Sequence, residues 1–156
     1  MNGDDMKAAN PIREQTQTES VVNHASETAF RGHILLVEDD ASLGQLEAAI
    51  LIAHGYIVTL VENGELALSA LHETIPDLVL LDLELPGTVN GWDVLQSLRA
   101  YASTSTTPVL LTSAEVTAQK HLRTRGENRS TLDHLAKPYM IPTLLKRIER
   151  MLGMTP

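Results

Sequence analysis

The chain has 156 residues, 43% of them hydrophobic, with a formal net charge of -8. This length suits one domain with a single core plus a tail, and the acidic balance argues against nonspecific nucleic-acid binding. The absence of cysteine excludes disulfides, thiolate metal sites and cysteine nucleophiles. Because no apolar run has the length of a membrane span and the first residues lack the pattern of a secretion signal, we expect a cytoplasmic protein.

The first part of the chain has the composition of a tail. Residues 1–31 are rich in Asn, Gln, Thr, Ser and Glu and contain few large apolar residues. Such a segment cannot bury enough surface to offset the entropy lost on ordering. We therefore expect a flexible N-terminal extension over residues 1–31 and one folded domain over residues 32–154.

Short apolar runs recur along the folded part, separated by segments of helical character. The first, His33–Val37, ends abruptly in Glu38, Asp39 and Asp40, as a buried strand does. Further strands are predicted at Tyr56–Val61, Leu78–Leu81, Val109–Thr112 and Thr131–Ala136. Alternating strands and helices predict an α/β fold, a doubly wound five-stranded parallel sheet in the order 2-1-3-4-5 with five helices.

Apolar spacing and stop signals predict the helices between these strands. The first is expected to end at Gly55 and to face the sheet with Leu43, Leu46, Ala49 and Ile50. The second, capped by Asn63, is expected to face the sheet with Leu66, Ala67, Ala70 and Leu71. The other three are predicted at Gly91–Leu98, between Glu115 and Arg125, and around Leu144–Leu152.

Polar side chains follow four of the expected strands. These are Glu38 and Asp39 after the first, Asp82 after the third, Ser113 after the fourth and Lys137 after the fifth. Parallel strands present their carboxyl ends at one edge of a sheet, so we expect Glu38, Asp39 and Asp82 to converge there. A single acidic residue at a strand end is often only a surface residue, but five such groups at successive ends favour a site.

The chemistry of this group favours phosphoryl transfer. Three carboxylates held together need a cation, and oxygen ligands without a His or Cys partner favour Mg²⁺ over zinc. With the ion, Lys137 and the Ser113 hydroxyl can hold phosphoryl oxygens while an Asp82 oxygen attacks phosphorus in line. A carboxylate is already ionised at neutral pH, so this attack requires no general base.

The same strand ends carry sequence motifs of a known family. ILLVEDD (34–40), LVLLDLELPG (78–87), LLTSAE (110–115) and AKPY (136–139) resemble the receiver domain of bacterial two-component response regulators, over roughly residues 32–152. The resemblance implies that Asp82 is the phosphoacceptor, Lys137 the phosphate-contacting lysine and Ser113 the switch hydroxyl. It also implies a cis peptide before Pro138, Asp40 as the start of the following helix, and an Mg²⁺ site formed by Glu38, Asp39, Asp82 and the Glu84 backbone carbonyl.

By this resemblance the chain would be a stand-alone response regulator rather than an enzyme. It would accept a phosphoryl group from a phosphohistidine of a sensor histidine kinase or a histidine phosphotransfer protein. Because the chain ends soon after its last expected helix, we expect no output domain. The signal would then pass by contact to an unknown protein target, with no nucleic-acid partner and no insertion into a membrane.

Two positions depart from the family pattern. The loop between Pro86 and Gly91 is one residue longer than the commonest form, so its shape is expected to differ. His134 stands where the family usually has a Tyr or Phe that rotates inward on activation. His134 either moves toward the space vacated by Ser113, as a pH-sensitive switch, or faces solvent without a signalling role. The solvent-facing interpretation is favoured, because lone histidines are commonly surface residues.

Basic residues gather in the last third of the chain, on the fourth helix, fifth strand and fifth helix. They are Lys120, Arg123, Arg125, Arg129, Lys146, Arg147 and Arg150. This face is either a solvated surface or a surface for a partner or a homodimer, as it often is in the family.

Three rival hypotheses fit the sequence less well. A haloacid-dehalogenase-type phosphohydrolase also uses Asp, Ser or Thr, Lys and magnesium, but its nucleophile lies on the first strand and its metal-binding acids come last. A flavodoxin-like binding module would need a phosphate loop where Glu38, Asp39 and Asp40 stand. A degenerate receiver acting as a phosphorylation-independent binding module is disfavoured because every chemical group is present.

Overall fold

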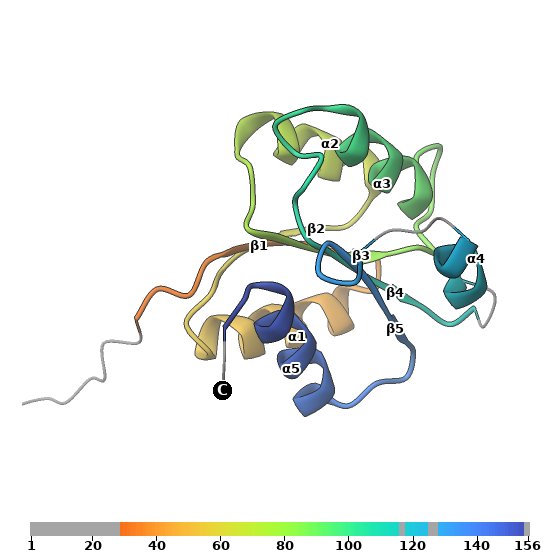
Figure 1. The fold of residues 1–156 in the computed structure, drawn as a ribbon. Coiled ribbons are helices and arrows are strands. Elements are labelled where there is room, and N and C mark those ends of the chain that lie inside the picture. The colour runs from red at the N-terminus through yellow and green to blue at the C-terminus, as the bar shows by residue number, and fades with distance from the viewer. Residues whose placement is uncertain (1–28, 116–117, 125–127, 155–156) are drawn as a thin grey trace, which may run out of the picture.

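The computed structural model describes residues 29–115, 118–124 and 128–154, so residues 1–28 of the expected extension lie outside the described residues. Strands and helices alternate as β1 (His33–Val37), α1 (Ala41–Ala53), β2 (Ile57–Val61), α2 (Gly64–Glu73), β3 (Leu78–Asp82), α3 (Gly91–Ala100), β4 (Val109–Ser113), α4 (Ala118–Thr124), β5 (Leu132–Ala136) and α5 (Ile141–Met151). The strands form one parallel sheet in the order β2-β1-β3-β4-β5, which confirms the predicted fold (Figure 1). None of the described helices is long and apolar enough to span a membrane.

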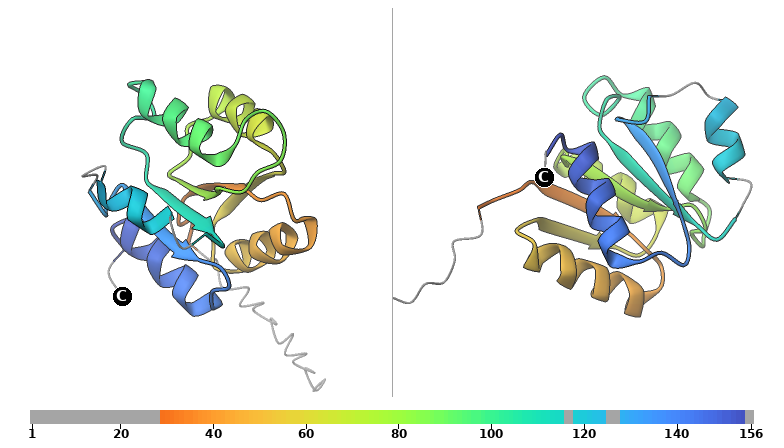
Figure 2. Two further views of the ribbon diagram at one scale, coloured as in Figure 1. Left: turned by 90° about the vertical axis from the view of Figure 1, so that its right-hand side faces the viewer. Right: turned by 60° about the horizontal axis from the view of Figure 1, so that its bottom comes forward.

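Helices cover both faces of the sheet. Figures 1 and 2 show α2 and α3 on one face and α1 and α5 on the other, with α4 beside β4 and β5. Side chains of β1 alternate accordingly: Leu35 and Val37 join the cluster on the α3 side, and Ile34 and Leu36 the cluster on the α5 side. A strand that is buried on both faces needs apolar residues throughout, which is why the strands read as continuous apolar runs.

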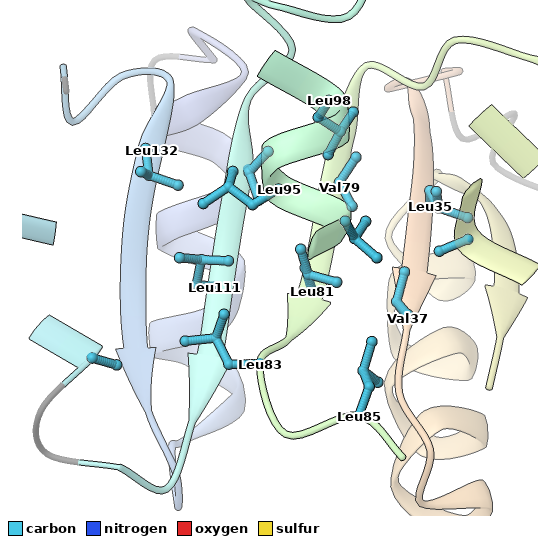
Figure 3. Close-up of a cluster of buried hydrophobic side chains, with 14 residues drawn as sticks. Leu35, Val37, Val79, Leu81, Leu83, Leu85, Leu95, Leu98, Leu111 and Leu132 are labelled. Carbon is cyan, nitrogen blue, oxygen red and sulfur yellow. The ribbon is translucent and has the colours of Figure 1, made fainter. Parts of the chain in front are cut away.

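The central strands β3 and β4 are the most deeply enclosed part of the sheet. Every residue of both strands is buried. In the cluster drawn in Figure 3, Val79, Leu81 and Leu111 lie against Leu95 and Leu98 of α3. Burying apolar side chains of this size contributes about 1.5–3 kcal/mol each. The carboxyl ends of β3 and β4 are therefore fixed by the core that precedes them.

Side-chain caps set the starts of three helices. Asp40 Oδ1 accepts a hydrogen bond from the Leu43 backbone N–H at 2.9 Å, which confirms Asp40 as the start of α1. Asn63 caps α2 in the same way, as predicted. Asn90 and Asp93 form a reciprocal capping box at α3. Within the predicted fourth helix, α4 spans Ala118–Thr124, and Arg125 lies outside the described residues.

The predicted inward faces of α1 and α2 are partly wrong. Leu46 is 55% exposed and Ala49 is also exposed, whereas the buried positions of α1 are Gly44, Glu47 and Leu51. Leu66 of α2 is 44% exposed. Helix α1 packs against β2, and Leu66 lines a hollow with Leu60 and Val61 of that strand. Because β2 is an edge strand, fewer of the described elements surround these positions than surround the central strands. The apolar pattern missed the true face of α1 because one of its buried residues is a carboxylate.

Candidate functional site

Three carboxylates converge at the carboxyl ends of β1 and β3, as the sequence predicts. Glu38 and Asp39 directly follow β1, Asp82 ends β3, and the two strands are paired in the sheet. One carboxylate oxygen from each residue lies within 4.8 Å of the other two. Glu38 and Asp82 are each only 3% exposed, whereas Asp39 is exposed to solvent. The group therefore offers oxygen ligands with one side open to solvent, which suits a hard cation such as Mg²⁺.

Lys137 brings a positive charge to this group from the carboxyl end of the edge strand β5. Its Nζ donates hydrogen bonds to Glu38 Oε2 at 2.8 Å and to Asp82 Oδ2 at 3.0 Å. Burial lowers the pKa of Lys137, but the bonds to Glu38 and Asp82 outweigh this effect and leave the pKa raised. Burial also raises the pKa of Glu38, against the opposing effect of the Lys137 hydrogen bond. The ammonium group therefore stays charged and bridges the two buried carboxylates at neutral pH.

Backbone groups hold the other oxygens of the site. Asp82 Oδ1 accepts a hydrogen bond from the Glu84 N–H at 2.8 Å, so the Asp82 carboxylate is held at both oxygens. The Ser113 side chain is fully buried, and its Oγ accepts from the Glu115 N–H at 2.8 Å. The peptide between Lys137 and Pro138 is cis, as the family resemblance implies. A metal-binding role for the Glu84 carbonyl stays a prediction.

The loop after Asp82 is anchored to the first turn of α2. The backbone N–H and the hydroxyl of Thr88 both donate to Glu65 Oε1, at 3.3 and 2.7 Å. These hydrogen bonds lower the pKa of Glu65, and the bond from the Thr88 hydroxyl has the largest effect. Val89 lies so close to α2 that a Cβ placed on Gly64 would come within 2.2 Å of its carbonyl oxygen. The longer loop that the sequence indicated is thus held against a helix beside the site.

His134 is not the solvent-facing residue that the sequence analysis favoured. It is only 8% exposed, and burial lowers its pKa, so that the imidazole is neutral at pH 7. His134 lies on the same face of β5 as Leu132, which belongs to the core cluster beside α3. The error has a physical reason: β5 is an edge strand, and strand alternation alone does not tell whether a neighbouring helix covers an edge position.

Sequence reasoning missed a buried pair close to the site. Glu47 of α1 is 1% exposed and accepts a short hydrogen bond from the Tyr139 hydroxyl. Burial raises the pKa of Glu47, and the hydrogen bond from Tyr139 opposes this only in part. Burial also raises the pKa of Tyr139, as does its hydrogen bond to Glu47, so the hydroxyl remains protonated and able to donate. The sequence signal that could have revealed this pair was Glu47 itself, a charged residue among the apolar positions of a helix that has no other charged residue.

Replacing Glu47 by glutamine is expected to stabilise the protein at neutral pH. Because the folded state raises the pKa of Glu47, its contribution to stability is fully present below the usual value of 4.5 and is lost as the pH rises through the higher folded pKa. Glutamine cannot ionise, so Glu47→Gln should remove this pH dependence and make the protein more stable than the unaltered chain at pH 7. Denaturant unfolding of both proteins from pH 4 to pH 8 measures the difference.

Tyr139→Phe is the matched control for this pair. It removes the hydroxyl that donates to Glu47 and leaves the buried carboxylate without that partner. Such a loss costs about 1–3 kcal/mol. Stability curves for Glu47→Gln and the unaltered protein that run parallel over the whole pH range would contradict this account of Glu47.

Comparison with known proteins assigns the chain to a family. The family model for the response regulator receiver domain matches residues 34–149, a span that includes Glu38, Asp82 and Lys137. The chain belongs to the response regulator receiver family. The receiver is 38% identical over 123 residues to the DNA-binding response regulator MtrA of Mycobacterium tuberculosis H37Rv, a match covering 79% of this chain and 51% of MtrA. It is 34% identical to the transcriptional regulatory protein BaeR of Escherichia coli, covering 76% of this chain and 47% of BaeR.

Solved receiver structures have the same fold. The receiver domain of the sensor histidine kinase PA1611 from Pseudomonas aeruginosa, described with a magnesium ion in its active-site cleft, is 29% identical, with a TM-score of 0.68, covering 78% of this chain and 98% of that domain. A response regulator from Chloroflexus aurantiacus is 28% identical, with a TM-score of 0.69 and the same coverage. The chain spans about half the length of the curated relatives it matches. The chain therefore corresponds to the receiver domain of response regulators, the domain that operates in two-component signalling.

Proposed function

We propose that this receiver accepts a phosphoryl group on Asp82 from a phosphohistidine of a sensor histidine kinase or a histidine phosphotransfer protein. One observation carries the proposal: Asp82 Oδ2 lies 3.0 Å from Lys137 Nζ, within a group of three carboxylates that has one side open to solvent. An ionised carboxylate beside a fixed ammonium group is a nucleophile that needs no base. The donor must therefore supply a good leaving group.

The residues present fit a magnesium ion. Glu38, Asp39 and Asp82 offer oxygen ligands within 4.8 Å of one another, and among the described residues no His or Cys joins them. A bound Mg²⁺ would neutralise negative charge on the phosphoryl oxygens. The other tasks fall to the protein: Lys137 contacts a phosphoryl oxygen, and the Glu84 N–H holds the Asp82 oxygen to which it already donates.

Phosphorylation would act on the protein surface through Ser113. A phosphoryl group adds about -1.5 to -2 charges at neutral pH and several strong acceptors. The buried Ser113 hydroxyl can donate to it, and because Ser113 Oγ also accepts from the Glu115 N–H, a shift of Ser113 would draw the start of the α4 segment with it. The balance between two conformations of α4 and β5 would then change, and a protein target would bind one of them. We propose that this α4-β5-α5 face contacts that target or a second copy of the chain.

Incubation with a small phosphodonor and Mg²⁺ tests the proposal. Intact-mass spectrometry should show an increase of one phosphoryl group that depends on the metal and is absent from Asp82→Asn. Asparagine keeps the size of the side chain but has no anionic oxygen for the attack. A mass increase that persists in Asp82→Asn would falsify the assignment of Asp82, and rapid turnover of a generic phosphoester would favour a phosphohydrolase instead.

A further inference from the structure

A polar cavity lies between α4, β5 and α5, and none of the carboxylates of the proposed phosphoryl site lines it. Its volume is about 160 Å³, and its polar lining includes Arg123, Arg129, Asp133, His134 and Arg147. The cavity therefore combines residues from two helices, the edge strand and the segment that precedes it. Its size suits a small group rather than a large cofactor.

His134 brings an unsatisfied polar atom to this cavity. Across residues 29–115, 118–124 and 128–154, His134 Nε2 is the buried side-chain nitrogen or oxygen that has no hydrogen-bond partner. Leaving a buried polar atom unpaired costs free energy, so such atoms in proteins usually have a protein, water or ligand partner. A ligand that accepts a hydrogen bond from Nε2–H would recover this cost.

The charged groups of the cavity favour an anion. Asp133 is already occupied, because its Oδ2 accepts from both Arg147 and Arg150. In the part of the chain that the structure describes, Arg123 and Arg129 form no ion pair, so both guanidinium groups are available. The lining thus carries three arginines against one aspartate, together with the imidazole of His134, whose pKa burial lowers. Guanidinium groups bind carboxylates and phosphates through paired hydrogen bonds.

We propose that this cavity binds a small oxyanion, a carboxylate or a phosphate, through His134 Nε2 and the guanidinium groups of Arg123 and Arg129. The bound oxyanion joins α4 to the edge of β5. The site is separate from phosphoryl transfer, since neither Asp82 nor a metal ion takes part. Its ligand is either a free phosphate ion or the carboxylate of an acidic side chain on a protein that contacts this face.

Titration of the full chain with two probes tests the proposal and distinguishes the two sources. Inorganic phosphate represents the free ion, and N-acetylglutamate amide represents an acidic side chain. The titrations are followed by the NMR signals of the His134 ring, in a Tris chloride buffer without divalent ions. One probe should give a saturable shift. Tighter binding of phosphate identifies a free oxyanion as the ligand, and tighter binding of the glutamate compound identifies a partner side chain.

Three variants and one control complete the test. Arg123→Gln, Arg129→Gln and His134→Phe should each weaken binding by about tenfold, the loss expected for one charge-assisted hydrogen bond. Calorimetry gives the affinity of His134→Phe, which lacks the imidazole signal. Lys120→Gln removes the same charge from α4 without lining the cavity and should change the affinity by less than about twofold. Both arginines are exposed, so their replacement leaves the core intact. Equal weakening by Lys120→Gln, or no saturable shift with either probe, would overturn the site.

Discussion

Lys137→Met is expected to destabilise the receiver by about 3 kcal/mol at neutral pH, the lower end of the cost of breaking a buried ion pair. The Lys137 ammonium group is bonded to Glu38 and Asp82, whose side chains are only 2% and 3% exposed. Methionine keeps most of the length of the side chain but leaves two buried carboxylates without their cation. Because the pKa of Lys137 is raised in the folded state, its stabilising effect is fully present at neutral pH and is lost only as the pH rises through that pKa.

The same change should slow the proposed phosphorylation of Asp82 by about 100-fold or more, as expected when one preorganised charge is removed from a transition state. The mass-spectrometric assay measures the rate, and denaturant unfolding at pH 7 measures the stability. Lys137→Arg is the control, since it keeps the charge and alters the geometry. We expect it to recover most of the stability but only part of the rate. A methionine variant as stable as the unaltered protein would show that Lys137 does not balance these carboxylates.

Gly91→Ala is expected to destabilise the fold by about 3 kcal/mol or more, at the upper end of the cost of overpacking. Gly91 is the first residue of α3, and a Cβ there would lie 2.4 Å from the Asp82 carbonyl oxygen and 2.6 Å from the Leu83 Cα. Both atoms belong to the backbone, so they cannot move aside as the end of a side chain can. Either the helix would have to shift away from the end of β3, or the Asp82–Leu83 backbone would have to move and displace the Asp82 carboxylate.

Gly44→Ala is the matched control for Gly91→Ala. Gly44 is also buried in a helix, but its added Cβ would meet the Leu60 Cδ1 at 3.1 Å, and Leu60 is a flexible side chain on the edge strand. Alanine also favours the helical conformation over glycine by about 1 kcal/mol. We expect Gly44→Ala to stay within about 1 kcal/mol of the unaltered protein. Thermal unfolding of both variants compares them, and equal losses would contradict the steric account of Gly91.

The sequence was sufficient to predict the parts of the molecule that depend on local patterns. Continuous apolar runs indicated the five strands, and their alternation with helices led to the correct sheet order. Placement of Glu38, Asp39 and Asp82 followed from that order, because strand ends meet at one edge of a parallel sheet. The roles of these residues, the expected absence of an output domain and the expected absence of a nucleic-acid partner remain predictions.

Features that depend on contacts between distant segments could not be predicted in this way. Glu47 is buried because Tyr139, 92 residues further along the chain, donates to it, and helical periodicity contains no trace of that partner. The basic face carries less unpaired positive charge than a count of its basic residues suggests, since Arg147 and Arg150 both bind the Asp133 carboxylate. His134 was misplaced for a different reason, because the apolar pattern does not show that the neighbouring helix α4 packs beside β5, on which His134 lies buried.

Asp133 and the two arginines that bind it lie at an edge of the sheet. β5 is the last strand of the sheet, so one side of its backbone has no neighbouring strand among the described residues. A free edge of this kind is a template for aggregation, and an inward-pointing charged residue is one of the features that deter it. Asp133, held by Arg147 and Arg150 from α5, places such a charge cluster on β5. Two chains that meet at this face should therefore join through side chains, each keeping its own sheet, rather than form one continuous intermolecular sheet.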